Sequence, residues 1–331
     1  MGSQFDIEAE GARIREEGRF LEEIAAEVGR VIVGQRPLVE RLLMALLCRG
    51  HVLLEGVPGL AKTLTVKALS QAVGAQFSRI QFTPDLLPAD VVGTQVYQPD
   101  VHRFTVKRGP VFASMVLADE INRAPAKVQS ALLEAMEERQ VTIGEETLRL
   151  PEPFLVLATQ NPIEQEGTYP LPEAQMDRFL FKLKVDYPSQ QEEEDIMRRM
   201  AGRVPDPVRA VASIQSVLAA AKRVDELYLD DALYAYVAHV VRATRQPAGY
   251  GLSDLSGLVA YGASPRASIA MVRAARAHAF LRHRAYVTPD DIKGVALDVL
   301  RHRVLLTYEA QAEDVSVEQV IGRVLDTIEA P

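Results

Sequence analysis

The feature that most constrains how this chain folds is a glycine-rich segment between an apolar run and a helical pattern. The apolar run covers residues 52–54, and residues 64–69 have helical spacing. Between them the sequence reads Gly56-Val57-Pro58-Gly59-Leu60-Ala61-Lys62-Thr63. A buried strand, a tight turn and a helix start occur here in the order of a phosphate-binding loop, whose backbone N–H groups face the phosphates. We therefore expect this segment to bind a nucleotide.

Two side chains of this loop have predicted roles in binding. We expect Lys62 to reach the β and γ phosphates and the Thr63 hydroxyl to bind Mg²⁺. Ala61 stands where the usual pattern has a second glycine, and its methyl group is tolerable if a helix start keeps its φ helical. A turn that contains Lys-Thr by chance is the alternative. The predicted nucleotide-binding residues of the loop are Gly56, Pro58, Gly59, Leu60, Ala61, Lys62, Thr63 and Leu64.

A pair of adjacent carboxylates follows a second apolar stretch. Residues 111–118 are largely apolar and end at Asp119 and Glu120. In open parallel sheets, ligands bind at the carboxyl ends of the strands. We predict that Asp119 holds Mg²⁺ through water and that Glu120 activates the attacking water. The alternative is that these residues cap the next helix; the prediction of hydrolysis rests mainly on Glu120.

Four other positions are candidate site residues. Asn161 follows the buried strand predicted at 154–158, where an amide can orient the attacking water; an Asn-Pro turn is the alternative. Arg266 lies in the first turn of a predicted helix, where the dipole disfavours a cation, so it indicates either an anionic partner or a solvated side chain. Val33 and Gly34 belong to a short apolar turn that either packs on the base or only connects two helices.

Composition excludes several classes of protein. The chain has 331 residues, enough for two domains or for one domain with a lid. Its net charge of −8 argues against general attraction to nucleic acid or anionic lipid. Cys48 is the only cysteine, so a disulfide framework is excluded. No apolar run approaches the roughly 20 residues of a membrane span, and the first residues lack a signal sequence. We therefore expect a cytoplasmic protein.

The pattern of predicted elements changes near residue 187. Before this point, strands at 77–82, 154–158 and 179–185 alternate with helices, and two hairpins interrupt the order at 91–107 and 140–150. The first hairpin is either a working part or a surface loop of no consequence. From residue 190 the pattern is entirely helical. The predicted helices cover residues 6–30, 37–48, 64–74, 125–138, 172–178, 189–201, 213–221, 230–244, 265–283, 289–301 and 316–328.

Six motifs follow one another along the chain. They are residues 56–63, Gln81-Phe82-Thr83-Pro84-Asp85-Leu86-Leu87-Pro88, Asp119-Glu120-Ile121-Asn122-Arg123-Ala124, Thr159-Gln160-Asn161-Pro162, Pro172-Glu173-Ala174-Gln175-Met176-Asp177-Arg178-Phe179 and Gly262-Ala263-Ser264-Pro265-Arg266. Together these motifs resemble the MoxR family of AAA+ ATPases, in the clade that carries an insert in helix 2. The resemblance extends from about residue 22 to the C-terminus, and Ala61 resembles the family's own variant of the phosphate loop.

This resemblance implies an α/β fold, namely an AAA+ P-loop αβα sandwich with a five-stranded parallel sheet. It implies a nucleotide-binding domain at 1–187 and a C-terminal all-helical lid domain at 188–331, with residues 83–107 as the helix-2 insert and 140–150 as the hairpin before sensor 1. The resemblance assigns Asn161 as sensor 1, Arg178 as the arginine finger offered to a neighbouring subunit, and Arg266 as sensor 2.

By the same resemblance, we expect an Mg²⁺-dependent ATPase that forms a homo-oligomeric, hexameric ring. Similar proteins are chaperone-like motors that remodel, mature or load cofactors into partner complexes, and they often work with a protein carrying a von Willebrand factor A domain. The alternatives are a magnesium-chelatase-like motor subunit and a nucleotide-gated scaffold with negligible hydrolysis. A DNA motor is disfavoured because one hairpin tip reads Gly144-Glu145-Glu146 and the net charge is acidic.

Overall fold

The computed structural model describes residues 7–57, 59–162, 167–201 and 206–331. The chain divides into two compact units. The core unit comprises Phe20–Phe179 and Leu183–Leu218, and the lid unit comprises Met1–Arg19, Leu180–Lys182 and Ala219–Pro331. Each unit is described by itself. The predicted domain boundary at residue 187 stays a prediction.

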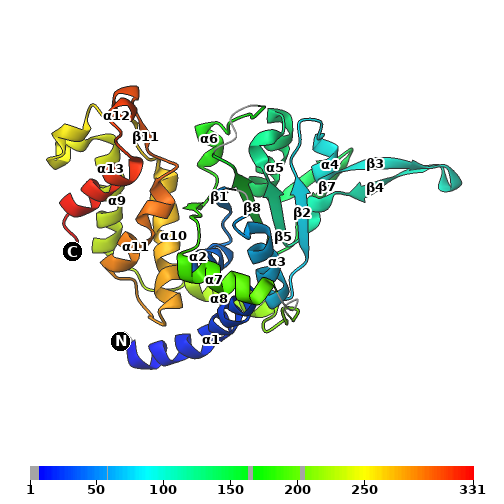
Figure 1. The fold of residues 1–331 in the computed structure, drawn as a ribbon, viewed down its shortest axis with the longest axis horizontal. Helices are drawn as coiled ribbons and strands as arrows, with labels where there is room; N and C mark the ends of the chain where they lie inside the picture. Colours follow the sequence, from blue (N-terminus) through cyan, green and yellow to red (C-terminus); the bar gives the residue numbers. More distant parts are fainter. Residues whose placement is uncertain (1–6, 58, 163–166, 202–205) are drawn as a thin grey trace, which may run out of the picture. The chain divides into compact units, whose positions relative to one another are not determined.

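The core unit is built on the predicted five-stranded parallel sheet, in the order β2-β5-β8-β1-β9 (Figure 1). Because β8 lies between β5 and β1, the carboxyl ends of these three strands meet at one edge. The three central strands β1, β5 and β8 are buried almost throughout and form the continuous apolar runs that are typical of parallel strands covered on both faces. The strands are β1 (Val52–Glu55), β2 (Phe77–Gln81), β5 (Met115–Asp119), β8 (Leu155–Gln160) and β9 (Phe181–Lys184).

Helices cover both faces of the sheet, as the αβα prediction requires. Alternate strand residues such as Leu53, Val116 and Val156 share one buried cluster with α5. On the other face, α3 contacts β2 and β5. The helices of the core unit are α2 (Arg36–Leu47), α3 (Lys62–Val73), α4 (Pro88–Val92), α5 (Ala126–Glu138), α6 (Glu173–Met176) and α7 (Gln190–Met200), with 3-10 turns η1 (Pro99–Val101), η2 (Pro110–Phe112) and η3 (Ile121–Arg123).

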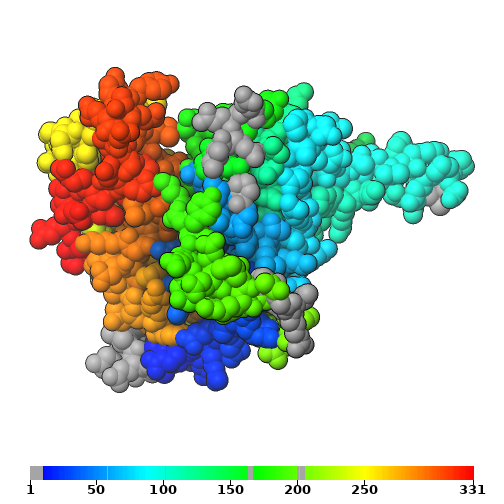
Figure 2. All heavy atoms as spheres, viewed as in Figure 1, coloured from blue at the N-terminus to red at the C-terminus, as the bar shows by residue number. Residues whose placement is uncertain are grey.

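Both predicted hairpins are present in the core unit. The longer one, β3 (Gly93–Gln98) with β4 (Arg103–Arg108), extends well beyond the sheet (Figures 1 and 2). The shorter one pairs β6 (Gln140–Ile143) with β7 (Glu146–Arg149) and turns at Gly144. The prediction was wrong for residues 91 and 92, which belong to α4 and not to the strand, because Pro88 starts a helix there.

The lid unit is mainly helical, but it also holds a small sheet. β10 (Val259–Tyr261) pairs with β11 (Leu305–Leu306), so the prediction of an entirely helical pattern was wrong at this point. Such short strands carry too little periodicity to be recognised in a sequence. The helices are α9 (Asp231–Arg245), α10 (Pro265–Leu281), α11 (Pro289–Leu300), α12 (Tyr308–Ala312) and α13 (Val317–Thr327), with η4 (Pro247–Tyr250) and η5 (Ser253–Leu255).

Two helices contain residues of both units. α1 (Ile7–Val31) starts in the lid unit and continues into the core unit, and α8 (Ile214–Asp225) runs in the opposite order. The predicted helices over 6–30 and 213–221 match them closely.

Candidate functional site

The glycine-rich segment forms a loop between β1 and α3. Lys62, the first residue of α3, donates from Nζ to the carbonyl of Gly56 at 2.5 Å, so its ammonium group lies inside the loop. Burial lowers the pKa of Lys62, and the negative charges of Asp119 and Glu120 oppose this shift. The lysine and the two carboxylates therefore share one electrostatic environment.

The expected conformation of Ala61 was wrong. Ala61 precedes the first helical residue and has φ 54° and ψ 17°, which is left-handed. A left-handed φ costs a residue with a Cβ about 1 kcal/mol. Its side chain is exposed, so the methyl group meets the surface and not the packed interior. Pro58, another predicted loop residue, lies outside the described residues.

Gly56 is required for a different reason, namely close packing. A Cβ at Gly56 would lie 2.7 Å from the carbonyl oxygen of Val185. Val185 donates its backbone N–H to Glu55, so the chain after β9 passes directly over the start of the loop. The glycine at this position therefore allows the edge strand to close against the loop.

The two carboxylates lie where the sequence predicted, at the carboxyl end of β5. A hydroxyl group on the neighbouring strand β8 fixes both: Thr159 Oγ1 donates to Asp119 Oδ1 at 2.6 Å and accepts the backbone N–H of Glu120 at 2.8 Å. The backbone of Glu120 has a left-handed conformation, with φ 57°, and its side chain makes no capping hydrogen bond to the 3-10 turn that follows. These contacts disfavour the helix-capping alternative.

Strand β2 adds two polar side chains to which the sequence had assigned no role. Arg79 donates to Asp119 Oδ2 from Nε at 3.0 Å and from Nη2 at 2.7 Å. The same Nη2 donates to Gln81 Oε1 at 2.6 Å, and Gln81 Nε2 donates to Glu120 Oε2 at 2.8 Å. Arg123 also donates to Glu120 Oε2, at 3.2 Å. Both Asp119 and Glu120 therefore accept hydrogen bonds from other side chains of the site.

The roles of these residues can be predicted only when the order of the strands in the sheet is known. Residues 79 and 81 alternate along one predicted strand and therefore share a face. The sequence does not say which strand lies beside β2, so it cannot pair these side chains with Asp119 and Glu120. The role of Thr159 was not predicted for the same reason, because its hydrogen-bond partners are at the end of β5, a different strand.

The donor set fits Mg²⁺. This ion takes hard oxygen ligands, is often held by one or two carboxylates plus substrate phosphates, and keeps several waters. Asp119 and the half-buried Thr63 supply such oxygens. Within residues 7–57, 59–162, 167–201 and 206–331, no group of three or more His, Cys, Asp or Glu side chains could hold a metal by itself. A site that depends on nucleotide phosphates is consistent with that finding.

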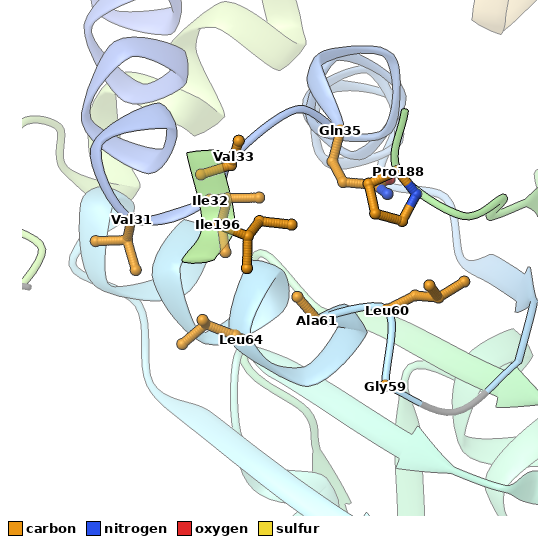
Figure 3. Close-up of a pocket in the computed structure, with 10 residues that line it drawn as sticks. All are labelled: Val31, Ile32, Val33, Gln35, Gly59, Leu60, Ala61, Leu64, Pro188 and Ile196. Atoms are coloured by element: carbon orange, nitrogen blue, oxygen red, sulfur yellow. The ribbon is translucent and has the colours of Figure 1, made fainter. Parts of the chain in front are cut away.

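An apolar pocket lies beside the phosphate loop (Figure 3). Residues just after α1 form one side of the pocket, residues 59–61 and 64 form another, and Ile196 of α7 reaches in between. An apolar pocket next to a phosphate cradle can hold a planar base. Val33, predicted to contact the base, lines the pocket. Gly34 is not among its lining residues, and its Cα faces the Glu192 carboxylate.

The other predicted residues are placed as follows. Asn161 is buried directly after β8, between the ends of the strands that carry the carboxylates and the loop. Arg178 follows α6 and pairs with Glu137 of α5, Nη2 to Oε2 at 2.9 Å. Arg266 lies in the first turn of α10 in the lid unit, after the N-cap Ser264, as predicted.

Comparison with known proteins agrees with this geometry. A family profile described as the ATPase family associated with various cellular activities (AAA) matches residues 51–181, and an AAA lid domain profile matches residues 255–324. Chaperone MoxR1 of Mycobacterium tuberculosis is 55% identical over 94% of this chain and 82% of the relative. The chain belongs to the MoxR family of AAA+ ATPases.

Other members of the MoxR family match along nearly the whole chain. Protein MoxR of Paracoccus denitrificans is 35% identical over 95% of this chain and 96% of the relative. A crystal structure of a Cytophaga hutchinsonii protein, described as a candidate ATPase, has a TM-score of 0.91 with 48% identity and covers 98% of both chains. Among the residues that the structure describes, no helix is long and apolar enough to cross a membrane.

Proposed function

We propose that this protein is a ring-forming, Mg²⁺-dependent ATPase motor that remodels, matures or loads cofactors into a partner protein complex. The observation that carries the proposal is the convergence of Lys62, which follows β1, with Asp119 and Glu120 at the end of β5, on the two sides of β8 and beside an apolar pocket. Family membership supports the ATPase activity.

Binding uses the loop and the pocket together. The triphosphate lies along the loop, where backbone N–H groups and the Lys62 ammonium neutralise its charge. Thr63 and Asp119 would hold Mg²⁺, which would neutralise the charge that develops on the phosphates. The base enters the pocket lined by Val33 and Leu64. The site thereby binds both ends of the nucleotide.

Hydrolysis depends on a positioned water. Glu120 takes a proton from the water as it attacks the γ phosphate, and Asn161 holds the water in line. The Thr159 contacts keep the backbone of Glu120 in place while the side chain moves to the water. Arg178 stabilises the transition state in the neighbouring subunit, and Arg266 senses the γ phosphate from the lid.

The chaperone-like activity is supported by the name of Chaperone MoxR1. We expect a cytoplasmic hexamer that acts on a protein client together with a partner carrying a von Willebrand factor A domain. A magnesium-chelatase-like subunit and a scaffold with negligible hydrolysis remain alternatives. Phosphate release by the purified protein separates the motor from the scaffold.

Two variants test the site. Lys62→Ala is expected to abolish ATP binding, because Lys62 contacts phosphate in the ground state. Glu120→Gln is expected to keep binding and to lose turnover, because Glu120 acts on water only in the transition state. Calorimetric titration with ATP and a phosphate-release assay separate these effects. Normal turnover in Glu120→Gln would show that another group is the base.

The Glu120→Gln protein also tests the motor. A protein that binds ATP without turnover is expected to hold its client in the ATP state. The client should therefore copurify with Glu120→Gln in ATP and not in ADP. Lys62→Ala is the matched control, and equal recovery of the client with this variant would argue against a nucleotide-driven motor.

A further inference from the structure

Arg79 stands out because it carries a permanent positive charge against the predicted metal ligand. It is half-exposed on β2, whereas the Asp119 side chain is only 13% exposed. An arginine cannot lose its proton in a protein. Its ion pair with Asp119 is therefore not broken by loss of a proton, and it opens when the side chain turns into solvent or when another cation takes its place.

The two oxygens of Asp119 have separate partners. Thr159 donates to Oδ1, and both Arg79 donors converge on Oδ2. The guanidinium therefore competes with Mg²⁺ or its water shell for Oδ2, and its positive charge repels the ion near either oxygen. A divalent cation in a water-filled site holds a carboxylate more strongly than a monovalent group does, so the exchange is feasible once nucleotide supplies the remaining ligands.

Arg79 also sets the orientation of Gln81. Because a guanidinium only donates, the amide of Gln81 must turn its oxygen to Arg79 and its NH₂ group outwards. The NH₂ group then donates to Oε2 of Glu120. A single arginine thus restrains the metal ligand directly and the candidate base through one amide.

We propose that Arg79 is the resting counter-cation of the Asp119–Glu120 pair, and that it leaves Asp119 when Mg²⁺ and nucleotide bind. This inference rests on the proposed function of the same site. Arg79 is a positioning residue: it holds the carboxylates while the site lacks Mg²⁺, and its departure frees Oδ2 and releases the orientation of Gln81. Nucleotide binding therefore depends less on Mg²⁺ in the presence of Arg79 than it would if the two carboxylates had no counter-cation.

The test measures how strongly Mg²⁺ and nucleotide assist each other. The quantity is the ratio of the dissociation constants of the non-hydrolysable ATP analogue AMP-PNP in EDTA and in saturating Mg²⁺, obtained by calorimetry. In Arg79→Met, uncompensated carboxylates weaken binding without Mg²⁺, and the lack of a competing cation strengthens binding with it. The ratio should rise roughly 3- to 10-fold, as expected for one charge near a divalent ion in a solvated site.

Three further variants make the result decisive. Arg79→Lys keeps the charge and should leave the ratio close to that of the original protein, whereas Arg79→Gln removes the charge with less change of volume and should raise it. Arg198→Met removes an arginine from an exposed ion pair on α7 and should leave the ratio unchanged. An unchanged ratio in folded Arg79→Met and Arg79→Gln proteins would overturn the inference. Failure of the unaltered protein to bind AMP-PNP would instead refute the proposed function.

Discussion

At the scale of single residues, the phosphate loop uses its small side chains for two different physical purposes. Gly56 is needed because the chain after β9 leaves no space for a Cβ. Ala61 has space for its methyl group but takes a left-handed φ that glycine would adopt without strain. An exchange between glycine and alanine should therefore change stability by different amounts at these two positions.

We predict that Gly56→Ala lowers the free energy of unfolding by roughly 1–3 kcal/mol, because overpacking forces the backbone to shift. Ala61→Gly should change it by less than about 1 kcal/mol, since relief of the left-handed strain offsets the greater freedom of the unfolded chain. Urea denaturation measures both. A larger loss in Ala61→Gly than in Gly56→Ala would contradict this view of the loop.

Glu27 of α1 provides a prediction of pH dependence. A hydrogen bond from Arg30 and the backbone N–H of Arg209 hold the pKa of the buried Glu27 carboxyl at about 2, below its ordinary value of 4.5. Because the folded pKa is lowered, the charged group stabilises the fold above pH 4.5 and loses this effect as the pH falls towards 2.

The variant Glu27→Gln should therefore be less stable than the original protein at pH 7. The difference should shrink as the pH falls through 4.5 towards 2. Urea midpoints at several pH values measure it. Because other carboxyl groups titrate in both proteins, only the difference between the two is informative. A difference that stays constant from pH 7 to pH 3 would exclude an ionic role for Glu27.

At the scale of elements, the two hairpins contact each other. The side-chain amide of Gln95, on β3, lies where a Cβ on Gly144 would be, and Gly144 has φ +64° in the turn between β6 and β7. The longer hairpin is thus supported at its base by the shorter one. The aromatic pair Tyr97 and Phe104, with ring centroids 5.3 Å apart, lies further out and is exposed.

We predict that Gly144→Ala loosens both hairpins, because it adds backbone strain and displaces Gln95. Amide hydrogen exchange should become faster over residues 93–98 and 140–149 and stay unchanged in α5. Gly251→Ala is the matched control, since Gly251 also has a positive φ, +75°, and no atom near its Cβ position. Faster exchange in only one hairpin would show that the hairpins are independent.

The sequence predicted elements well where the signal is local. The phosphate loop, β5 with its carboxylates and both hairpins follow from apolar runs, turn residues and alternation. The contacts that complete the site do not, because Arg79, Gln81 and Thr159 act across strands whose order depends on tertiary packing. The left-handed φ of Ala61 was not predicted either. Its strain is local to the backbone, and the exposed methyl group adds no packing conflict to that strain.

At the scale of the whole molecule, the open question is whether Arg178 completes a site in a second copy of the chain. Its observed partner is Glu137, and both side chains are about one-third exposed, so the ion pair contributes about 1 kcal/mol or less. A purely local role would therefore leave turnover largely intact after the pair is broken. A role in a neighbouring site should appear as a large kinetic effect.

We predict that Arg178→Ala binds ATP nearly normally and loses turnover by a factor on the order of 10³, as expected for an arginine finger. Glu137→Gln breaks the same ion pair and keeps the arginine, so it should retain most activity. The rate per subunit of the unaltered protein should rise with concentration as rings form. Equal losses in Arg178→Ala and Glu137→Gln would assign Arg178 a local role.

Mixing two inactive proteins then tests action between subunits. Arg178→Ala retains Glu120, and Glu120→Gln retains Arg178, so a mixed ring contains some sites in which an intact Glu120 meets an intact Arg178 from the neighbour. Activity should return in part when the proteins are mixed, and it should follow the fraction of such sites. The double variant carrying both changes is the control, since mixing it with Arg178→Ala creates no site with both groups. If mass measurement shows mixed rings and the mixture stays inactive, Arg178 does not act in the neighbouring site.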